Sequence, residues 1–224
     1  MTPTIAVCFS GCGVRDGSEI HESTLTLWAL DRAGATSLCC APDLEQVSVI
    51  DHRTGKPMPD ERRNVLTESA RLARGEIHPL SRVSPERIDG LIFPGGFGVA
   101  VNLCTFGIDG PHCRVDPSVE ALVAGLIEAA KPVGGICIAP ALLARIYGSR
   151  GLEPRLTIGN DAATAHSLAV MGAEHVPCAV DDCVVDHSNR LVTTPAYMLG
   201  RGPAEVAPGI ERLVEEVLKM AGAA

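Results

Sequence analysis

The residues with the clearest potential for chemistry surround Cys137, in the segment Gly135-Ile136-Cys137-Ile138-Ala139. An apolar run at residues 132–136 predicts a buried strand before the cysteine, and the residues after it predict a helix. A sharp strand-to-helix turn strains the backbone of its central residue, and small residues two positions away on each side relieve the crowding. The pattern predicts a nucleophile elbow, with a buried cysteine in an ordinary strand-to-helix connection as the alternative.

An elbow at this place has a consequence for the thiol. Ligands of open α/β sheets bind beyond the carboxyl ends of the strands, and Cys137 is expected at such an end. The unpaired N–H groups and the dipole of the following helix favour a thiolate over a thiol. Pro140 fits the first turn of that helix, where its missing N–H costs nothing. We therefore expect Cys137 to have a low pKa.

Two other groups are expected at the same sheet edge. Gly95 and Gly96 follow a buried strand at 91–93, and their N–H groups are free to form an oxyanion hole, with a plain tight turn as the alternative. Glu22 falls in the first turns of the helix after the first strand, so its carboxylate is expected near the strand ends. Taken alone, Glu22 would more commonly be an acid that stabilises the helix N-terminus. Glu19 competes with Glu22 for any catalytic role.

The chain has nine cysteines, an odd number that argues against a secreted disulfide framework. None forms a Cys-x-x-Cys pair, and no histidine pair has zinc-finger spacing, so we expect no metal site. Most are read as small buried hydrophobic residues in a reducing cytosol, Cys8, Cys39, Cys40 and Cys183 among them. Besides Cys137, only Cys12 is expected to border the pocket, from the loop after the first strand.

The composition excludes several classes of protein. Hydrophobic residues make up 46% and charged residues 21%, as in a folded globular protein. A net charge of −8 disfavours binding to nucleic-acid phosphates, which requires clustered Lys and Arg. No apolar run approaches the roughly 18 residues of a membrane span, and no signal peptide is in view. We expect a cytoplasmic protein that binds neither nucleic acid nor membranes.

Strand and helix patterns alternate along the 224 residues, which predicts a single α/β domain over residues 1–224 with a mainly parallel sheet. The first helix is expected to begin at Ser18 and to end at Arg32-Ala33-Gly34. A hairpin is expected near the C-terminal end, over 180–185 and 190–193. The other expected strands are 4–9, 36–41, 46–51, 91–93 and 132–136, and the other expected helices are 64–73, 117–130, 162–171 and 204–220.

Several motifs together resemble the PfpI-like superfamily of class I glutamine amidotransferase-fold proteins, and within it the ElbB branch of isoprenoid-biosynthesis glyoxalases. The resemblance covers nearly the whole chain and implies a flavodoxin-like three-layer sandwich. It is carried by Ser10-Gly11-Cys12-Gly13-Val14, Asp16-Gly17-Ser18-Glu19-Ile20-His21-Glu22, Arg74-Gly75-Glu76-Ile77, Pro94-Gly95-Gly96-Phe97-Gly98, Cys137-Ile138-Ala139-Pro140-Ala141, Gly172-Ala173-Glu174-His175-Val176-Pro177-Cys178 and Thr193-Thr194-Pro195-Ala196-Tyr197-Met198.

The resemblance implies a role for each matching residue. Cys137 matches the elbow nucleophile, Glu22 matches the helix glutamate, and Gly96 with the Ile138 amide matches the oxyanion hole. Many relatives have a histidine directly after the nucleophile, where this chain has Ile138. His175 is the nearest candidate for a third catalytic partner by order in the chain, although a histidine at a strand entry is more often structural.

The implied activity is that of a weak, glutathione-independent glyoxalase III-type lyase, with possible deglycase-like activity. It converts glyoxal to glycolate, or methylglyoxal to lactate, through a hemithioacetal on Cys137. No metal, glutathione or nucleotide cofactor is implied, and the expected partners are a small aldehyde and a second copy of the chain in a homodimer. The alternative is a non-enzymatic redox-sensing or regulatory protein that uses the same cysteine.

Overall fold

A seven-stranded sheet forms the centre of the computed structural model, which describes residues 2–222. Its strands are parallel except for the edge strand β10, which runs antiparallel to β11. The parallel order means that six strands end at one edge of the sheet, where loops gather. Across the sheet the strands are β10 (Val184–Asp186), β11 (Leu191–Thr194), β7 (Val133–Ile136), β6 (Gly90–Phe93), β1 (Thr4–Cys8), β2 (Thr36–Ala41) and β5 (His78–Pro79).

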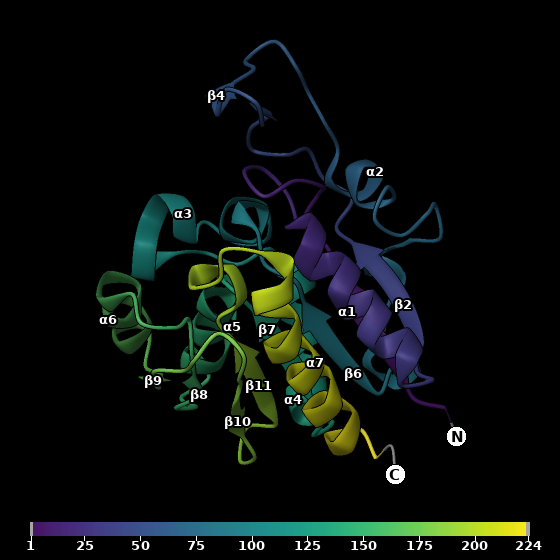
Figure 1. Cartoon of the computed structure of the whole chain (residues 1–224), viewed down its shortest axis with the longest axis vertical. Coiled ribbons are helices and arrows are strands. Elements are labelled where there is room, and N and C mark those ends of the chain that lie inside the picture. Colours follow the sequence, from purple (N-terminus) through teal and green to yellow (C-terminus); the bar gives the residue numbers. More distant parts are fainter. Residues whose placement is uncertain (1, 223–224) are drawn as a thin grey trace.

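Helices cover both faces of this sheet, because its strands are apolar on both sides. Along β1, Ala6 and Cys8 pack into one buried cluster, and Ile5 and Val7 pack into the other. The second cluster contains apolar side chains of α1 (Ile20–Arg32) and α7 (Pro203–Met220), which lie side by side over the sheet in Figure 1. The first contains those of α4 (Pro117–Glu128) and α5 (Ala139–Gly148). The result is a helix–sheet–helix sandwich.

Shorter elements surround the sheet edge where the parallel strands end. A hairpin, β3 (Ile50–Asp51) and β4 (Lys56–Pro57), projects from one end of the molecule, as Figure 1 shows. A single π-helical turn, η3 (Val99–Leu103), follows the glycines after β6. The remaining elements are α2 (Val65–Ser69), η1 (Leu80–Arg82), η2 (Pro85–Arg87), α3 (Phe106–Asp109), η4 (Gly110–His112), β8 (Arg155–Leu156), α6 (Ala162–Val170), β9 (Glu174–His175) and η5 (Ala196–Met198).

The α/β fold with a mainly parallel sheet is confirmed, and two helix boundaries are corrected. Glu19, not Ser18, is the N-cap of α1, because the Ser18 hydroxyl accepts a hydrogen bond from the Ser10 N–H at 2.9 Å instead. The helix expected over 64–73 is shorter, since the N–H groups of Arg71 and Leu72 bond to carbonyls three residues back. None of the helices within residues 2–222 is both long and apolar enough to cross a membrane.

Candidate active site

The candidate site lies beyond the carboxyl ends of four adjacent strands, β11, β7, β6 and β1. The segments that follow these strands, near residues 195–198, 137–138, 94–98 and 9–19, meet there. Backbone hydrogen bonds join two of them: Glu19 N–H donates to Gly95 C=O at 2.9 Å, and Phe97 N–H donates to Val14 C=O at 2.8 Å. Ligands of parallel α/β sheets bind at such strand ends.

Cys137 has the strained backbone that an elbow requires. Its φ of +61° lies in the left-handed region, which a residue with a Cβ rarely adopts. The strain is held by the sheet, because the Cys137 N–H donates to Thr194 C=O at 2.9 Å and so extends the β7–β11 pairing. The side chain is thereby turned toward the amides of Gly96 and Ile138, both of which hydrogen-bond to it. The elbow that the sequence predicts is present in the structure.

Glu22 lies buried on the first turns of α1 and contacts the same thiol. Its carboxyl group accepts hydrogen bonds from Gly95 N–H at 2.9 Å and from Tyr197 N–H at 3.3 Å. It also forms a side-chain hydrogen bond with Cys137. Burial raises the pKa of Glu22 to about 8, and the nearby Glu19 carboxylate adds to the shift. A carboxyl group with this pKa can accept and return a proton near neutral pH.

The expected low pKa of Cys137 is wrong. Burial raises the pKa of this thiol well above its usual value, and the charge and hydrogen bond of Glu22 raise it further. The amides of Gly96 and Ile138 act in the opposite direction, as the helix N-terminus was expected to, but their effect is smaller. Near neutral pH the resting state is a thiol beside a mostly protonated carboxyl group, and the ionised fraction of that carboxyl group can take the thiol's proton.

Two glycines allow these groups to approach. A Cβ on Gly95 would lie 2.5 Å from the Cys137 Cβ and 2.7 Å from the Glu22 Oε2, distances that no packed side chain tolerates. Gly96 has a φ of +96°, and a Cβ there would lie 2.4 Å from the backbone nitrogen of Glu19. The Pro-Gly-Gly turn therefore serves both to admit the Cys137 and Glu22 side chains and to direct an amide at the sulfur.

A cavity of about 770 Å³ opens over the sulfur. Its size is within the usual range for small-molecule sites. The walls are mostly apolar and come from seven regions of the chain, including the β3–β4 hairpin, η3, α3 and α6. The lining residues are Val14, Arg15, Glu19, Ile50, Gly55, Gly96, Phe97, Ala100, Phe106, Gly107, Cys137, Ile138, Thr164, Tyr197 and Met198.

The remaining residues expected in the site divide into one that lines it and two that do not. Glu19 lines the cavity, and its carboxylate caps α1 by accepting the Glu22 N–H at 2.7 Å. Cys12 is not among the cavity-lining residues; burial, and after it Glu68, raise its pKa. His175 is also absent from the lining, and its Nε2 accepts the Ile158 N–H at 3.4 Å. The geometry brings neither Cys12 nor His175 to the thiol.

The structure adds two polar residues to the site that the sequence analysis did not predict. Tyr197 lines the cavity, and its hydroxyl is 2.7 Å from the Nδ1 of His21. Arg15, on the loop after β1, supplies a guanidinium group to the same cavity. Tyr197 and His21 stand within quoted motifs, but spacing alone gives no sign that the two are in contact. Within residues 2–222, no three His, Cys, Asp or Glu side chains are arranged to hold a metal ion.

Known proteins share this sequence and fold. The human glutamine amidotransferase-like class 1 domain-containing protein 3, mitochondrial, is 44% identical over 97% of this chain and 83% of its own length. The crystal structure of an isoprenoid biosynthesis protein with an amidotransferase-like domain from Ehrlichia chaffeensis is 33% identical, with a TM-score of 0.91 over 98% of this chain and 99% of that one. Drosophila melanogaster DJ-1beta, 19% identical with a TM-score of 0.56 over 99% and 97%, shares the fold. No family model matches the chain.

These likenesses define an amidotransferase-like α/β protein. More narrowly, the chain belongs to the glutamine amidotransferase-like class 1 domain family. The chain is also similar in sequence to the ES1 proteins, with 43% identity to the rat ES1 protein homolog. The expected cytoplasmic location is contradicted, because the curated human, rat and zebrafish relatives are named as mitochondrial proteins. Reduced cysteines indicate a reducing environment but no particular compartment, and the prediction went further than its evidence.

Proposed function

We propose that this protein is a glutathione-independent glyoxalase that converts glyoxal to glycolate, or methylglyoxal to lactate, at Cys137. One observation carries the proposal: a buried thiol is hydrogen-bonded to a carboxyl group whose pKa is raised to about 8, beside two amides that face the sulfur. A nucleophile, a proton carrier and donors for an oxyanion are the groups that such a reaction needs.

The reaction begins when the Cys137 thiol gives its proton to the Glu22 carboxylate and the sulfur adds to an aldehyde carbon of glyoxal. The carbonyl electrons move to oxygen, which lies beside the amides of Gly96 and Ile138. Glu22 returns the proton to this oxygen, and the product is a hemithioacetal. Because the base and the acid are the same carboxyl group, a pKa between those of an ordinary carboxyl and an ordinary thiol suits both steps.

Glu22 then removes the hydrogen from the hemithioacetal carbon and delivers a proton to the neighbouring carbonyl oxygen, which gives an enediol. Its tautomerisation protonates the second carbon and leaves a thioester on Cys137. Water from the open cavity hydrolyses the thioester and releases glycolate and the free thiol. One carbon is oxidised and its neighbour is reduced, so the overall change is the addition of one water molecule, and no outside oxidant or reductant enters.

Hydrolysis of glutamine, which the family name suggests, is less well supported. Class I amidotransferases use Gly-x-Cys-x-Gly with a downstream His-x-Glu, whereas this chain has Ala139 in the last position of the first motif and lacks the second. His175 does not line the cavity. Among the described residues, no histidine lines the cavity to act as the imidazole base of that mechanism.

The test is turnover by the purified, reduced protein. Glycolate formed from glyoxal is measured by chromatography for the wild type, Cys137→Ala and Glu22→Gln, with Cys12→Ala as a matched cysteine control. The proposal expects product from the wild type and Cys12→Ala alone. If the wild type forms no more glycolate than Cys137→Ala, the glyoxalase assignment is overturned and the regulatory alternative is favoured. Light scattering on the same samples tests the expected homodimer.

One further part of the proposal follows from the similarity to a solved structure. The Ehrlichia protein carries the words isoprenoid biosynthesis in its description, and we extend that association to this chain. Small aldehydes remain the proposed substrates of the thiol, with the catalytic roles confined to Cys137, Glu22, Gly96 and Ile138.

A further inference from the structure

The cavity is larger than a small dialdehyde requires. Its volume of about 770 Å³ is in the upper part of the range for small-molecule sites, whereas glyoxal has only two carbons and two oxygens. Most of the excess is bounded by apolar side chains, including Phe97, which is 48% exposed, and Phe106. A substrate that fills this volume has an apolar body in addition to its reacting carbonyl.

One basic side chain faces this volume. Among the described residues that line the cavity, Arg15 alone carries a positive charge. Within residues 2–222 its guanidinium has no ion pair and no hydrogen bond to a protein group. The guanidinium packs against the hairpin at Gly55, where a Cβ would lie 3.4 Å from the Arg15 Nη1. The five donors of this guanidinium are therefore available to a ligand.

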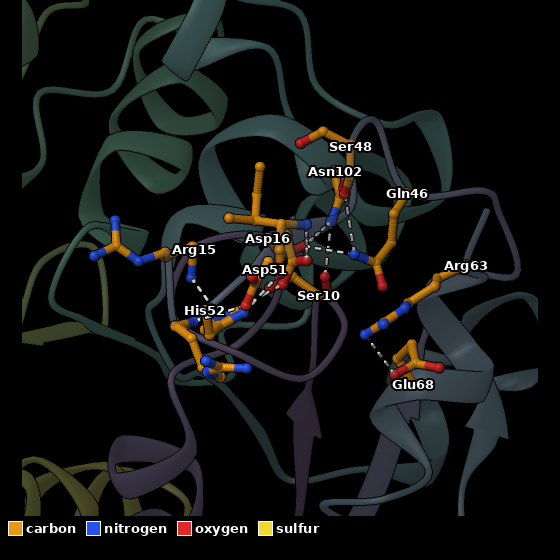
Figure 2. A network of polar contacts seen from close by, with 12 residues as sticks. Ser10, Arg15, Asp16, Gln46, Ser48, Asp51, His52, Arg63, Glu68 and Asn102 are labelled. Atoms are coloured by element: carbon orange, nitrogen blue, oxygen red, sulfur yellow. Dashed lines mark hydrogen bonds and ion pairs between the residues drawn. The ribbon is translucent and has the colours of Figure 1, made fainter. Parts of the chain in front are cut away.

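The backbone that carries Arg15 is fixed, even though its side chain is not. The Arg15 N–H donates to His52 Nε2 at 3.2 Å. The adjacent Asp16 is buried, its carboxylate accepts the Ile50 N–H at 2.8 Å, and its C=O accepts the side-chain amides of Gln46 and Asn102 at 3.0 and 2.9 Å. Figure 2 shows this network, with the Arg15 guanidinium directed away from it. Because this backbone is already ordered, binding of an anion has to order only the Arg15 side chain.

From these observations we propose that Arg15 forms an anion subsite, and that the site accepts, in addition to small aldehydes, a reactive carbonyl compound with an apolar body and a carboxylate. A guanidinium pairs with a carboxylate in a planar, two-bonded geometry. Arg15 is one positive charge, and Glu19 adds a negative charge to the same cavity. The cavity therefore suits a ligand with one negative charge better than a phosphate monoester with two. The carbonyl end rests on the proposed function at Cys137, whereas the anion subsite is testable without turnover.

Binding of two inert ligands of equal size measures the subsite directly. Calorimetry compares 4-phenylbutyrate with 4-phenylbutanamide, which differ in charge at one end only. The wild type is expected to bind the carboxylate at least about tenfold more tightly, and Arg15→Gln is expected to bind both within about twofold. Arg15→Lys should retain part of the preference. The matched control is Arg53→Gln, which removes an exposed guanidinium of the hairpin turn that does not line the cavity.

Several results would overturn the subsite: equal binding of the two ligands by the wild type, no binding of the carboxylate at millimolar concentration, or an unchanged preference in Arg15→Gln. A loss of preference in Arg53→Gln as large as in Arg15→Gln would do the same, since it would assign the effect to general charge. Tighter binding of 3-phenylpropyl phosphate than of the carboxylate would overturn the carboxylate assignment. Because no outcome depends on catalysis, a failure of the glyoxalase assay leaves these results interpretable.

Discussion

The Glu22 carboxyl group and the Cys137 thiol are hydrogen-bonded to each other in a space that has no room for one additional methyl group. Gly95 occupies the position where that methyl group would be, and its N–H donates to the carboxylate at 2.9 Å. The pair is thus both buried and crowded, so water cannot solvate either charge. Burial of this kind explains why both pKa values rise although two amides face the sulfur.

The first prediction concerns stability and pH. The Glu22 pKa is raised from 4.5 to about 8 on folding, so between these values the folded protein binds more protons than the unfolded chain. The free energy of unfolding therefore falls as pH rises, by up to about 1.4 kcal/mol per pH unit from this group. Glu22→Gln removes this pH-dependent loss of stability. The free energy of unfolding of the variant, relative to that of the wild type, should therefore increase from pH 5 to pH 8.

Denaturant unfolding at several pH values checks this expectation. Glu128→Gln, at an exposed position near the end of α4, serves as the control and should show no pH-dependent gap from the wild type. A constant difference between Glu22→Gln and the wild type across this range would mean that Glu22 is ionised in the folded protein at neutral pH, contrary to its burial.

The second prediction separates reactivity of the thiol from turnover. The charge and hydrogen bond of Glu22 raise the Cys137 pKa, so Glu22→Gln should lower it and increase the thiolate fraction. We expect iodoacetamide to alkylate Cys137 several-fold faster in this variant at pH 8, although glyoxal turnover falls by on the order of 100-fold or more. Peptide mass spectrometry measures the alkylation rate of Cys137, and the glycolate assay measures turnover on a separate, unalkylated sample.

Cys12 is the internal control for that measurement. Its pKa is raised by burial, Glu68 and Asp16 and lowered by Arg71, and Glu22 is not among the causes. Alkylation of Cys12 should therefore be the same in both proteins. Slower alkylation of Cys137 in Glu22→Gln would show that the carboxylate activates the resting thiol rather than suppressing it.

The sequence predicted the parts of the site that depend on local backbone pattern. The strand before Cys137 and the small residues around it define an elbow, and Gly95 and Gly96 after a buried strand define a turn with free amides. Glu22 was placed by its position in the first turns of the helix that follows the first strand. Each of these signals is local, and the parallel sheet brings them together because its strands end at one edge.

The sequence could not predict quantities that depend on the enclosed space. The direction of the Cys137 pKa shift was missed because burial and the Glu22 charge outweigh the amides, and burial is a property of the packed molecule. The contact between His21 and Tyr197 joins residues far apart in the chain. Arg15 is indistinguishable in sequence from any exposed loop arginine, and only the cavity gives it a role.

The third prediction tests the crowding around the catalytic pair. In Gly95→Ala the added methyl group would lie 2.5 Å from the Cys137 Cβ and 2.8 Å from the Ile136 carbonyl oxygen, so the elbow must move. We expect a loss of about 1–3 kcal/mol in the free energy of unfolding and nearly complete loss of turnover. The control is Gly202→Ala, where a Cβ meets nothing within 4 Å.

Gly202 is the N-cap of α7, so its replacement by alanine costs at most about 1 kcal/mol and should leave turnover unchanged. Denaturant unfolding and the glycolate assay read both effects. Wild-type turnover in Gly95→Ala would contradict the prediction, because it would mean that Glu22 and Cys137 need not be this close during catalysis.

The fourth prediction concerns the hydroxyl group of Tyr197, which is 2.7 Å from His21 Nδ1. The Tyr197 backbone N–H also donates to Glu22, so the residue links the Glu22 carboxylate to the cavity wall. His21 is largely exposed, and we expect it to act as a positioning residue that orients the Tyr197 hydroxyl toward a bound substrate. Tyr197→Phe and His21→Gln should each lower kcat/KM for glyoxal by about fivefold, as expected for the loss of one hydrogen bond.

A double-mutant cycle decides whether the two residues act together. If His21 works only through the Tyr197 hydroxyl, the double variant should be no slower than either single variant, since the second change removes nothing further. Independent roles would instead multiply the two losses to about 25-fold. His187→Gln, at an exposed turn between β10 and β11, is the control for removal of an imidazole and should leave kcat/KM unchanged. Because neither variant removes the carboxyl group of Glu22, the pH dependence of kcat should keep its wild-type midpoint, and a shifted midpoint would assign a proton-transfer role to His21 itself.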